Sequence, residues 1–171
     1  MNNEICWIPL NRGMYALIDA GDKEKVSRYK YHLRQRKDTC YAEREKKQAN
    51  GKLRTICLHQ DILGTKEGLE IDHKNGNGLD CRRENLRHCT HRQNMQNCRP
   101  YKGRRFKGVT IRKRKKKYMA RITYNGKNIY LGSFETEIEA AQAYDLAAIE
   151  HFGAFARINE YSRQELESGQ I

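Results

Sequence analysis

The positive charge of this 171-residue chain is concentrated in one segment. Residues 99–134 contain 13 lysines and arginines and no aspartate or glutamate. The remaining residues hold 21 basic and 21 acidic side chains, so the whole net charge of +13 belongs to that segment. A field this concentrated attracts polyanions and releases counterions when it meets phosphates. Nucleic acid is therefore the first partner to consider, and a membrane surface is the weaker alternative.

The composition favours two small domains over one large core, because only 37% of the residues are hydrophobic and 32% are charged. No run of 18 apolar residues is present, and residues 1–10 lack the basic and apolar regions of a signal peptide. We therefore expect an intracellular, cytoplasmic protein without a membrane partner.

The cysteines form no metal-binding motif in the sequence. No C-x-x-C pair occurs that could hold zinc. We expect free thiols that act as small buried hydrophobes, no disulfide framework and no zinc. The cysteines are Cys6, Cys40, Cys57, Cys81, Cys89 and Cys98.

The N-terminal half predicts a small sheet followed by a strand, loop, strand and helix. Alternating apolar and polar residues predict strands at 15–19, near 31 and 41, and at 53–58, with a turn at 48–51 between two of them. A helix over 22–29 capped by Asp22 and a short helix over 58–63 are also expected. Strands at 70–73 and 84–89 then flank a glycine-bearing loop at 75–78. Thr90 and Gln93 have capping-box spacing, which predicts a helix to about 97.

The C-terminal half predicts a three-stranded antiparallel sheet and one helix. Strands are expected at 108–112, 118–124 and 127–131, with a two-residue turn at Asn125-Gly126. Thr136 and Glu139 form a second capping box, and Gly153 ends the alanine-rich helix that it opens. Small side chains allow this helix to lie close to the sheet.

Four polar residues form the clearest chemical constellation. Asp72, His73, Asn85 and Asn94 lie on a frame that can bring them to one side of a shallow cleft. Phosphodiester hydrolysis needs a base for water and a cation for the developing charge. An unperturbed histidine has a pKa of about 6.5 and suits the base. Carboxylate and amide oxygens suit a hard cation such as Mg²⁺.

The motifs Ile71-Asp-His-Lys-Asn-Gly-Asn-Gly-Leu79, Arg83-Glu-Asn-Leu-Arg87 and Thr90-His-Arg-Gln-Asn94 resemble the HNH endonucleases of the phage and intron-borne homing type. The resemblance covers about residues 14–99. It implies that His73 is the general base, that Asp72 and Asn94 hold one Mg²⁺ or Mn²⁺ ion, and that Asn85 positions His73.

Three other histidines lie near these motifs. His91 is an alternative to Asn94 as a ligand, because it lies in the first turn of the same predicted helix. His59 is expected to fix local structure, and His88 to lie on the surface or contact phosphate.

Residues 106–159 resemble the Apetala/ethylene-response-factor DNA-binding domain. The resemblance rests on Lys107-Gly-Val109, Tyr118-Met-Ala-Arg-Ile122, Tyr130-Leu-Gly-Ser-Phe134 and Glu139-Ala-Ala-Gln-Ala-Tyr-Asp145. It implies a sheet that enters the major groove, with the helix packed behind it. Arg112 falls on a base-contacting arginine of that family, and Tyr118 and Tyr130 take positions usually held by tryptophan.

This chain departs from the family at Thr110, where arginine is frequent, and at Arg121, where glutamate is frequent. The recognised base sequence therefore cannot be transferred. We expect groove contacts from Arg112, Arg114 and Arg121. The lysines at 113 and 115–117, Lys116 among them, are expected to contact phosphates, which position a protein without reading sequence.

These features predict an α+β protein: a small N-terminal sheet leading into a ββα-metal motif, then a three-stranded antiparallel sheet packed on one helix. The expected domains are a nuclease domain at 1–99 with its core at about 57–98, a linker at 100–105, a DNA-binding domain at 106–160 and a tail at 161–171.

The resemblances imply a site-specific, metal-dependent DNA endonuclease of the homing type. We expect a monomer that nicks double-stranded phage or bacterial DNA and leaves 5′-phosphate and 3′-hydroxyl ends. Two alternatives stay open at this point: a DNA-binding transcriptional regulator with an inactive nuclease scaffold, and a nonspecific or structure-specific nuclease.

Overall fold

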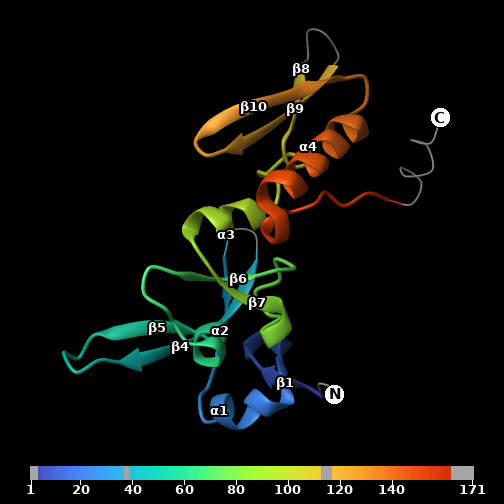
Figure 1. Cartoon of the computed structure of the whole chain (residues 1–171). Helices are drawn as coiled ribbons and strands as arrows, with labels where there is room; N and C mark the ends of the chain where they lie inside the picture. The colour runs from blue at the N-terminus through green and yellow to red at the C-terminus, as the bar shows by residue number, and fades with distance from the viewer. Residues whose placement is uncertain (1–3, 37–38, 113–116, 163–171) are drawn as a thin grey trace. The chain divides into compact units, whose positions relative to one another are not determined.

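The computed structural model describes residues 4–36, 39–112 and 117–162 (Figure 1). The chain divides into two compact units, Met1–Met95 and Gln96–Ile171. Both combine short helices with small antiparallel sheets, which confirms the predicted mixture of helix and strand. Within the described ranges no helix is both long and apolar enough to cross a bilayer.

The N-terminal unit contains three small sheets. Its elements are β1 (Ile5–Pro9), η1 (Asn11–Gly13), β2 (Tyr15–Asp19), η2 (Ala20–Asp22), α1 (Lys23–Ser27), β3 (His32–Gln35), β4 (Cys40–Lys47), β5 (Leu53–Cys57), α2 (Leu58–Leu63), β6 (Glu70–His73), η3 (Arg83–Asn85), β7 (Leu86–Cys89) and most of α3 (His91–Asn97). Strands β1 and β2 pair, β3, β4 and β5 form a second sheet in that order, and β6 pairs with β7. All four pairings within these three sheets are antiparallel.

One hydrophobic core joins these small sheets. Its buried members come from all three sheets and from both short helices, and include Ile18 of β2, Val26 of α1, Leu58 and Ile62 of α2, and Leu86 of β7. Because each strand pair is too small to enclose a core alone, the shared cluster stabilises them together. It also fixes β6 and β7 against α2.

The predicted capping role of Asp22 is wrong. Helix α1 is shorter than the predicted 22–29, and the Asp22 side chain makes no capping hydrogen bond. Instead Arg83 donates to both Asp22 carboxylate oxygens, at 2.8 and 2.7 Å, across 61 residues of chain. A bidentate pair with arginine outcompetes a backbone amide for this buried carboxylate.

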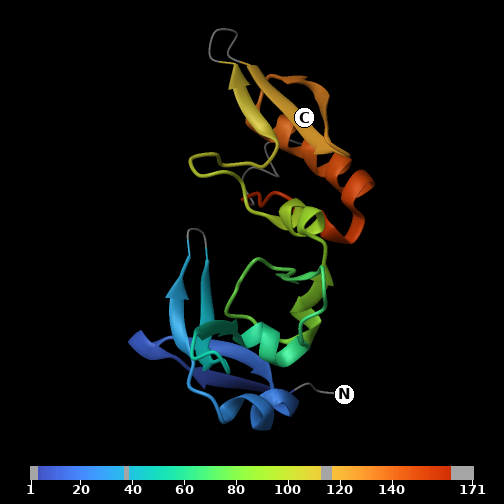
Figure 2. The same cartoon turned by 90° about the vertical axis from the view of Figure 1, so that its left-hand side faces the viewer.

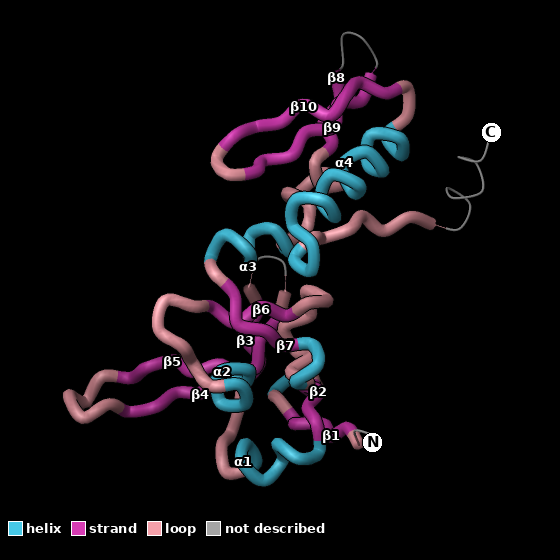
Figure 3. The backbone as a smooth tube through the Cα atoms, viewed as in Figure 1, coloured by secondary structure: helices cyan, strands magenta, loops and turns pink. Residues whose placement is uncertain are grey.

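The segment from β6 to α3 has the predicted strand, loop, strand and helix, with one difference. The chain between the two strands is loop apart from η3, so β7 begins at Leu86 and not at 84 (Figure 3). The capping box is present: the Gln93 amide donates to Thr90 Oγ1 at 3.2 Å, and the Thr90 amide donates to Gln93 Oε1 at 2.9 Å.

The C-terminal unit is a three-stranded antiparallel sheet with one helix on one face (Figures 1 and 2). Its elements are β8 (Val109–Arg112), β9 (Lys117–Tyr124), β10 (Lys127–Phe134), α4 (Glu137–Phe152) and η5 (Gly153–Phe155), with the sheet order β10-β9-β8. Strand β10 extends past the predicted end at 131 because a bulge between Tyr130 and Gly132 lets pairing resume.

Local signals set the ends of these elements. Asn125 and Gly126 both have positive φ, at 49° and 75°, as a primed hairpin turn requires. The Thr136–Glu139 capping box is formed at the start of α4. The alanines of α4 at 140, 141, 147 and 148 are buried against the sheet.

All six cysteines are free thiols. Cys81 and Cys89 are buried, as predicted for small hydrophobes, but Cys98 is exposed and the prediction is wrong there. Cys98 directly follows α3, outside both cores, which explains its exposure.

We predict that Gly108→Ala unfolds the C-terminal unit at markedly lower urea concentration. Gly108 has φ +79°, and a Cβ there would lie 1.9 Å from Cδ2 of the buried Tyr144. Left-handed strain and overpacking together cost about 3 kcal/mol or more. Urea titration followed by circular dichroism measures the loss.

Gly103→Ala is the matched control. Gly103 has a similar φ of +84°, but a Cβ there meets nothing within 4 Å. Only the conformational cost of about 1–2 kcal/mol should appear. Equal losses in the two variants would contradict the packing of Gly108 against Tyr144.

Candidate active site

Strand β6 presents Asp72 and His73 at its C-terminal end. Consecutive strand residues point to opposite faces, so the two side chains have different surroundings. Both are buried, with exposures of 5% each. The strand therefore separates a carboxylate from an imidazole although they are neighbours in sequence.

The His73 ring lies against His59 of α2. Their ring centroids are 4.9 Å apart at an interplanar angle of 85°, and Tyr41 lies 5.8 Å from each ring. Burial lowers the pKa of His73 to about 4, although the nearby Asp72 opposes this shift. Burial also lowers the pKa of His59 to about 3. Both imidazoles are therefore neutral at pH 7.

The expected role of His59 as a local structural residue is incomplete, because its ring forms one wall around His73. No local pattern could reveal this contact, since it joins a helix to a strand. His88 is half-buried, and its Nε2 lies 2.9 Å from the Gly64 carbonyl oxygen. It is therefore only partly at the surface, and its expected phosphate contact stays a prediction.

Arg87 holds the Asp72 carboxylate. Arg87 lies opposite Asp72 in the β6–β7 register, and its Nε and Nη2 both contact Asp72 Oδ2, at 2.8 and 2.7 Å. Charge-assisted contacts of this kind fix a carboxylate in position. Sequence reasoning missed Arg87, although its place in a strand paired with Asp72 is a signal that could have identified it.

Asn85 binds the loop that follows His73. Its Oδ1 accepts from the Asn75 amide at 3.0 Å, and its Nδ2 donates to Asn75 Oδ1 at 3.0 Å and to the Asp80 carbonyl at 2.7 Å. The Asn85 carbonyl also accepts from the Lys74 amide at 2.9 Å. These contacts order the backbone beside His73, whereas the sequence predicted that Asn85 positions His73 itself.

Glu70 is the second residue that sequence reasoning missed. Asn94 Nδ2 donates to Glu70 Oε2 at 2.6 Å, and His91 Nδ1 lies 2.8 Å from Glu70 Oε1. The hydrogen bonds from Asn94 and then His91 lower the pKa of Glu70. Glu70 precedes Asp72 by two residues and so shares its strand face. It therefore brings both alternative ligands on α3 to the Asp72 face.

A pocket of about 530 Å³ lies beside this arrangement. Tyr41 and His59 line it near the imidazole pair, and Glu70 and Asn94 line it near α3. It thus joins the surroundings of His73 to the carboxylate and amide groups. A volume of this size admits a polar group such as a phosphate with its water.

Asp72, Glu70 and Asn94 offer the oxygen atoms that a hard divalent cation takes. Asn94 binds Glu70 through its nitrogen, and its amide also has an oxygen of the type that Mg²⁺ prefers. The donor chemistry therefore fits Mg²⁺ or Mn²⁺, with Asp72 and Asn94 as the expected ligands.

The sheet of the C-terminal unit has one face covered by α4 and one open face. Arg112, Arg121 and Tyr130 are exposed, and the register pairs Arg121 with Tyr130. Arg121 alternates with the buried Ala120 and Ile122, so it points away from the helix. The open face therefore presents a basic and aromatic surface.

The prediction that Tyr118 belongs to this surface is wrong. Tyr118 shares its strand face with Ala120 and packs against the core cluster of Phe106 and Val109. Its half-buried side chain packs against this cluster, which also contains Ala140 and Ala141 of α4. Arg114 and Lys116, the other two expected contacts, lie outside the described residues.

Each of the two units contains a segment that matches a known protein family. The family model described as HNH endonuclease matches residues 64–96, and the AP2 domain model matches residues 104–154. The first range includes all four residues of the β6-to-α3 constellation, and the second covers the sheet and all of α4.

Relatives of known sequence are similar to part of the chain. The AP2-like ethylene-responsive transcription factor AIL7 of Arabidopsis thaliana is 42% identical over 66 residues, which cover 37% of this chain and 13% of that protein. APETALA2-like protein 2 of Oryza sativa subsp. indica is 44% identical over 54 residues, which cover 32% and 12%. The chain thus spans about an eighth of the length of these relatives.

We predict that acidification destabilises the metal-free protein through the buried imidazoles. The pKa values of His59 and His73 in the fold, about 3 and 4, lie below the ordinary 6.5. Between pH 6.5 and 4 the unfolded chain binds more protons than the folded one. The free energy of unfolding therefore decreases as the pH is lowered through this range. Thermal melts in chelator from pH 7.5 to 5 measure this slope.

His59→Gln should flatten the slope, because one of the two buried imidazoles is gone. His32→Gln is the control, since His32 is exposed on β3. A slope that is the same in both variants would contradict the burial of His59.

Proposed function

We propose that this chain is a site-specific, divalent-metal-dependent DNA endonuclease of the homing type. The observation that supports this most is the neutral, buried His73 beside a pocket whose other wall holds Glu70 and Asn94. The match of residues 64–96 to the HNH endonucleases agrees with it. We further propose a monomer that nicks one strand, because the described part of the chain forms one such site.

In this proposal the His73 imidazole accepts a proton from the attacking water. Its neutral form has the lone pair that a base needs, and the surrounding His59 and Tyr41 rings keep it oriented. Arg87 holds Asp72, and Glu70 holds Asn94, so both ligands are in place before substrate arrives. A bound Mg²⁺ would supply positive charge for the leaving 3′ oxygen. The products are 5′-phosphate and 3′-hydroxyl ends.

The C-terminal unit is proposed to find the target. Double-stranded DNA is the partner that fits its basic open face, and the match to the AP2 domain supports DNA binding. Arg112 and Arg121 are proposed to contact base edges, with Tyr130 packing beside them. Phosphate contacts from neighbouring lysines would position the sheet in the groove.

A DNA-binding transcriptional regulator with an inactive nuclease scaffold is the second candidate. The Arabidopsis thaliana relative AIL7 is named as a transcription factor. That candidate predicts DNA binding without cleavage in any divalent metal. It leaves the arrangement of His73, Asp72 and Asn94 without a use.

We predict that His73→Ala lowers cleavage by about 10²–10⁴-fold, the usual worth of a positioned base. DNA binding should be unchanged, because the substituted residue is in the N-terminal unit. Cleavage of a genomic fragment library in Mg²⁺ and in EDTA, with break ends sequenced on both strands, measures both the rate and the strand cut.

His32→Ala is the matched control, because it removes an exposed imidazole from the same unit. It should cleave like the unmodified chain. Full activity of His73→Ala would refute the assignment of the base. Retention of DNA without breaks in the unmodified chain would favour the regulator.

We predict that Arg121→Ala weakens binding to the selected target by about 1–3 kcal/mol, the worth of one good base contact. Affinity for unrelated duplex should change much less. Fluorescence anisotropy with both duplexes at one fixed salt concentration measures the ratio.

Arg28→Ala is the control for this variant, because it removes the same charge from an exposed position on the edge of α1. It should leave the ratio of target to unrelated affinity unchanged. An equal loss for both duplexes in Arg121→Ala would assign Arg121 to phosphate contact and exclude base recognition by it.

A further inference from the structure

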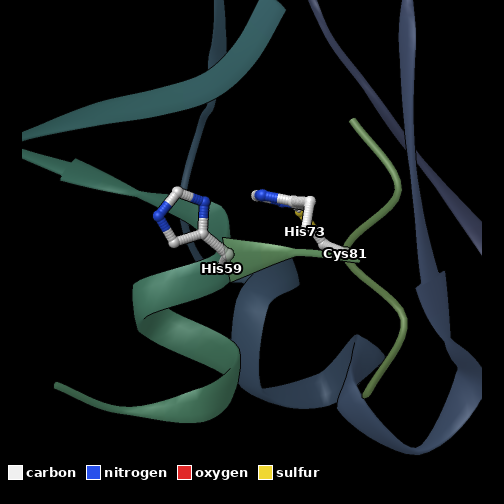
Figure 4. A group of neighbouring side chains, drawn as sticks. All are labelled: His59, His73 and Cys81. Atoms are coloured by element: carbon white, nitrogen blue, oxygen red, sulfur yellow. Dashed lines mark hydrogen bonds between the residues drawn. The ribbon is translucent and has the colours of Figure 1, made fainter. Parts of the chain in front are cut away.

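Three side chains around His73 form a cluster that the proposed hydrolysis does not use in full. His59 comes from α2, His73 from the end of β6 and Cys81 from the loop before η3. One donor atom of each lies within 4.8 Å of the other two, and all three residues are buried. Figure 4 shows the edge of the His73 ring pointing toward His59, with Cys81 beside His73.

The donor set differs in kind from the oxygen donors on the other face of β6. Two imidazole nitrogens and one sulfur suit a borderline-soft ion such as Zn²⁺, whereas Mg²⁺ prefers oxygen. The sequence predicted no zinc because no C-x-x-C pair is present. Here the donors are brought together by tertiary structure, across 22 residues from His59 to Cys81.

The distances are close to those of a tetrahedral zinc site. Cys81 Sγ lies 3.8 Å from His73 Nε2. Zinc bonds of about 2.3 Å to sulfur and 2.0–2.1 Å to nitrogen place such a pair about 3.6 Å apart. The widest separation in the cluster is at most 4.8 Å.

The surrounding structure holds the donors in place. The Cys81 amide donates to the Leu17 carbonyl at 2.8 Å, which fixes the loop to β2. Cys81 is fully buried, and Tyr41 packs against both imidazole rings.

We propose that His59, His73 and Cys81 form a Zn²⁺-binding site that is distinct from the Mg²⁺ ligands. Three protein ligands leave the fourth tetrahedral position for water. On binding, the Cys81 thiol releases its proton to solvent as the zinc–sulfur bond forms, and no electron is transferred.

Zinc at this site also stops cleavage, a consequence that rests on the proposed function. A His73 nitrogen bound to zinc cannot accept a proton from water. Zn²⁺ therefore inhibits the Mg²⁺-dependent reaction by occupying the base, while DNA binding by the other unit continues.

The test is metal binding by the full chain, with Co²⁺ as a spectroscopic substitute for Zn²⁺. We expect one equivalent of Co²⁺, a thiolate-to-cobalt charge-transfer band, and displacement of Co²⁺ by Zn²⁺. Cys81→Ser should abolish the band and weaken zinc binding at least about 100-fold, because even loss of an outer-shell partner costs about 10–100-fold.

Cys89→Ser is the matched control, since Cys89 is equally buried but donates to the Glu70 carbonyl. It should keep the band and the affinity. His59→Gln is a second ligand variant, used should Cys81→Ser fail to fold, and it should weaken zinc binding by a similar factor.

Absence of the charge-transfer band in the unmodified chain, or equal zinc affinity in Cys81→Ser and Cys89→Ser, would overturn the site. Cleavage assays in Mg²⁺ with added Zn²⁺ test the inhibition separately. If the chain binds zinc but never cleaves DNA, the proposed zinc site is supported and only the proposed nuclease activity is refuted.

Discussion

The arrangement around His73 depends on the hydrogen bonds made by the side-chain amide of Asn85. Strands β6 and β7 have four residues each, too few to order the chain between them. Asn85 makes three hydrogen bonds to Asn75 and Asp80, and so closes that chain into one shape. The same loop delivers Cys81 beside His73. Replacing these bonds with water would release both the loop and the wall of the imidazole pocket.

The two faces of β6 have different environments, so the adjacent residues Asp72 and His73 lie in polar and apolar surroundings respectively. On one face, carboxylates are compensated by Arg87, Asn94 and His91, so charge is tolerated there. On the other face, aromatic rings surround His73 and exclude water, so the neutral imidazole is favoured. Strand alternation is the cause, because no other local geometry separates adjacent side chains so completely. In the proposed function, the cation binds on the charged face and His73 acts as the base from the apolar face.

The features that the sequence could predict are those with local causes. Both capping boxes and the Asn125-Gly126 turn are formed, since each depends on residues within four positions. The pairing of Asp22 with Arg83 and the contact of His59 with His73 depend on tertiary packing, so no local pattern indicates them. Tyr118 was misplaced for a related reason: which strand face the helix covers is decided by core burial of Ala120, not by aromatic identity. Glu70 and Arg87 could have been predicted from strand spacing, because Glu70 lies two residues before Asp72 and Arg87 lies in the strand paired with it.

The charge distribution of the C-terminal unit decides which of its faces meets nucleic acid. Thirteen of its basic residues fall in 99–134, the range that contains the three strands, and only Arg157 and Arg163 come later, whereas its acidic residues begin at Glu135 and continue along α4 with Glu137, Glu139 and Glu150. The unit is therefore polarised, with an open sheet face that attracts phosphates and a helix that repels them. Like charges brought together at an interface cost several kcal/mol, so docking through the exposed side of α4 is disfavoured. The same polarity steers the unit during encounter, since the field acts before any contact forms. Electrostatics and the space that α4 occupies on the other face therefore both support the proposed recognition of DNA through the sheet.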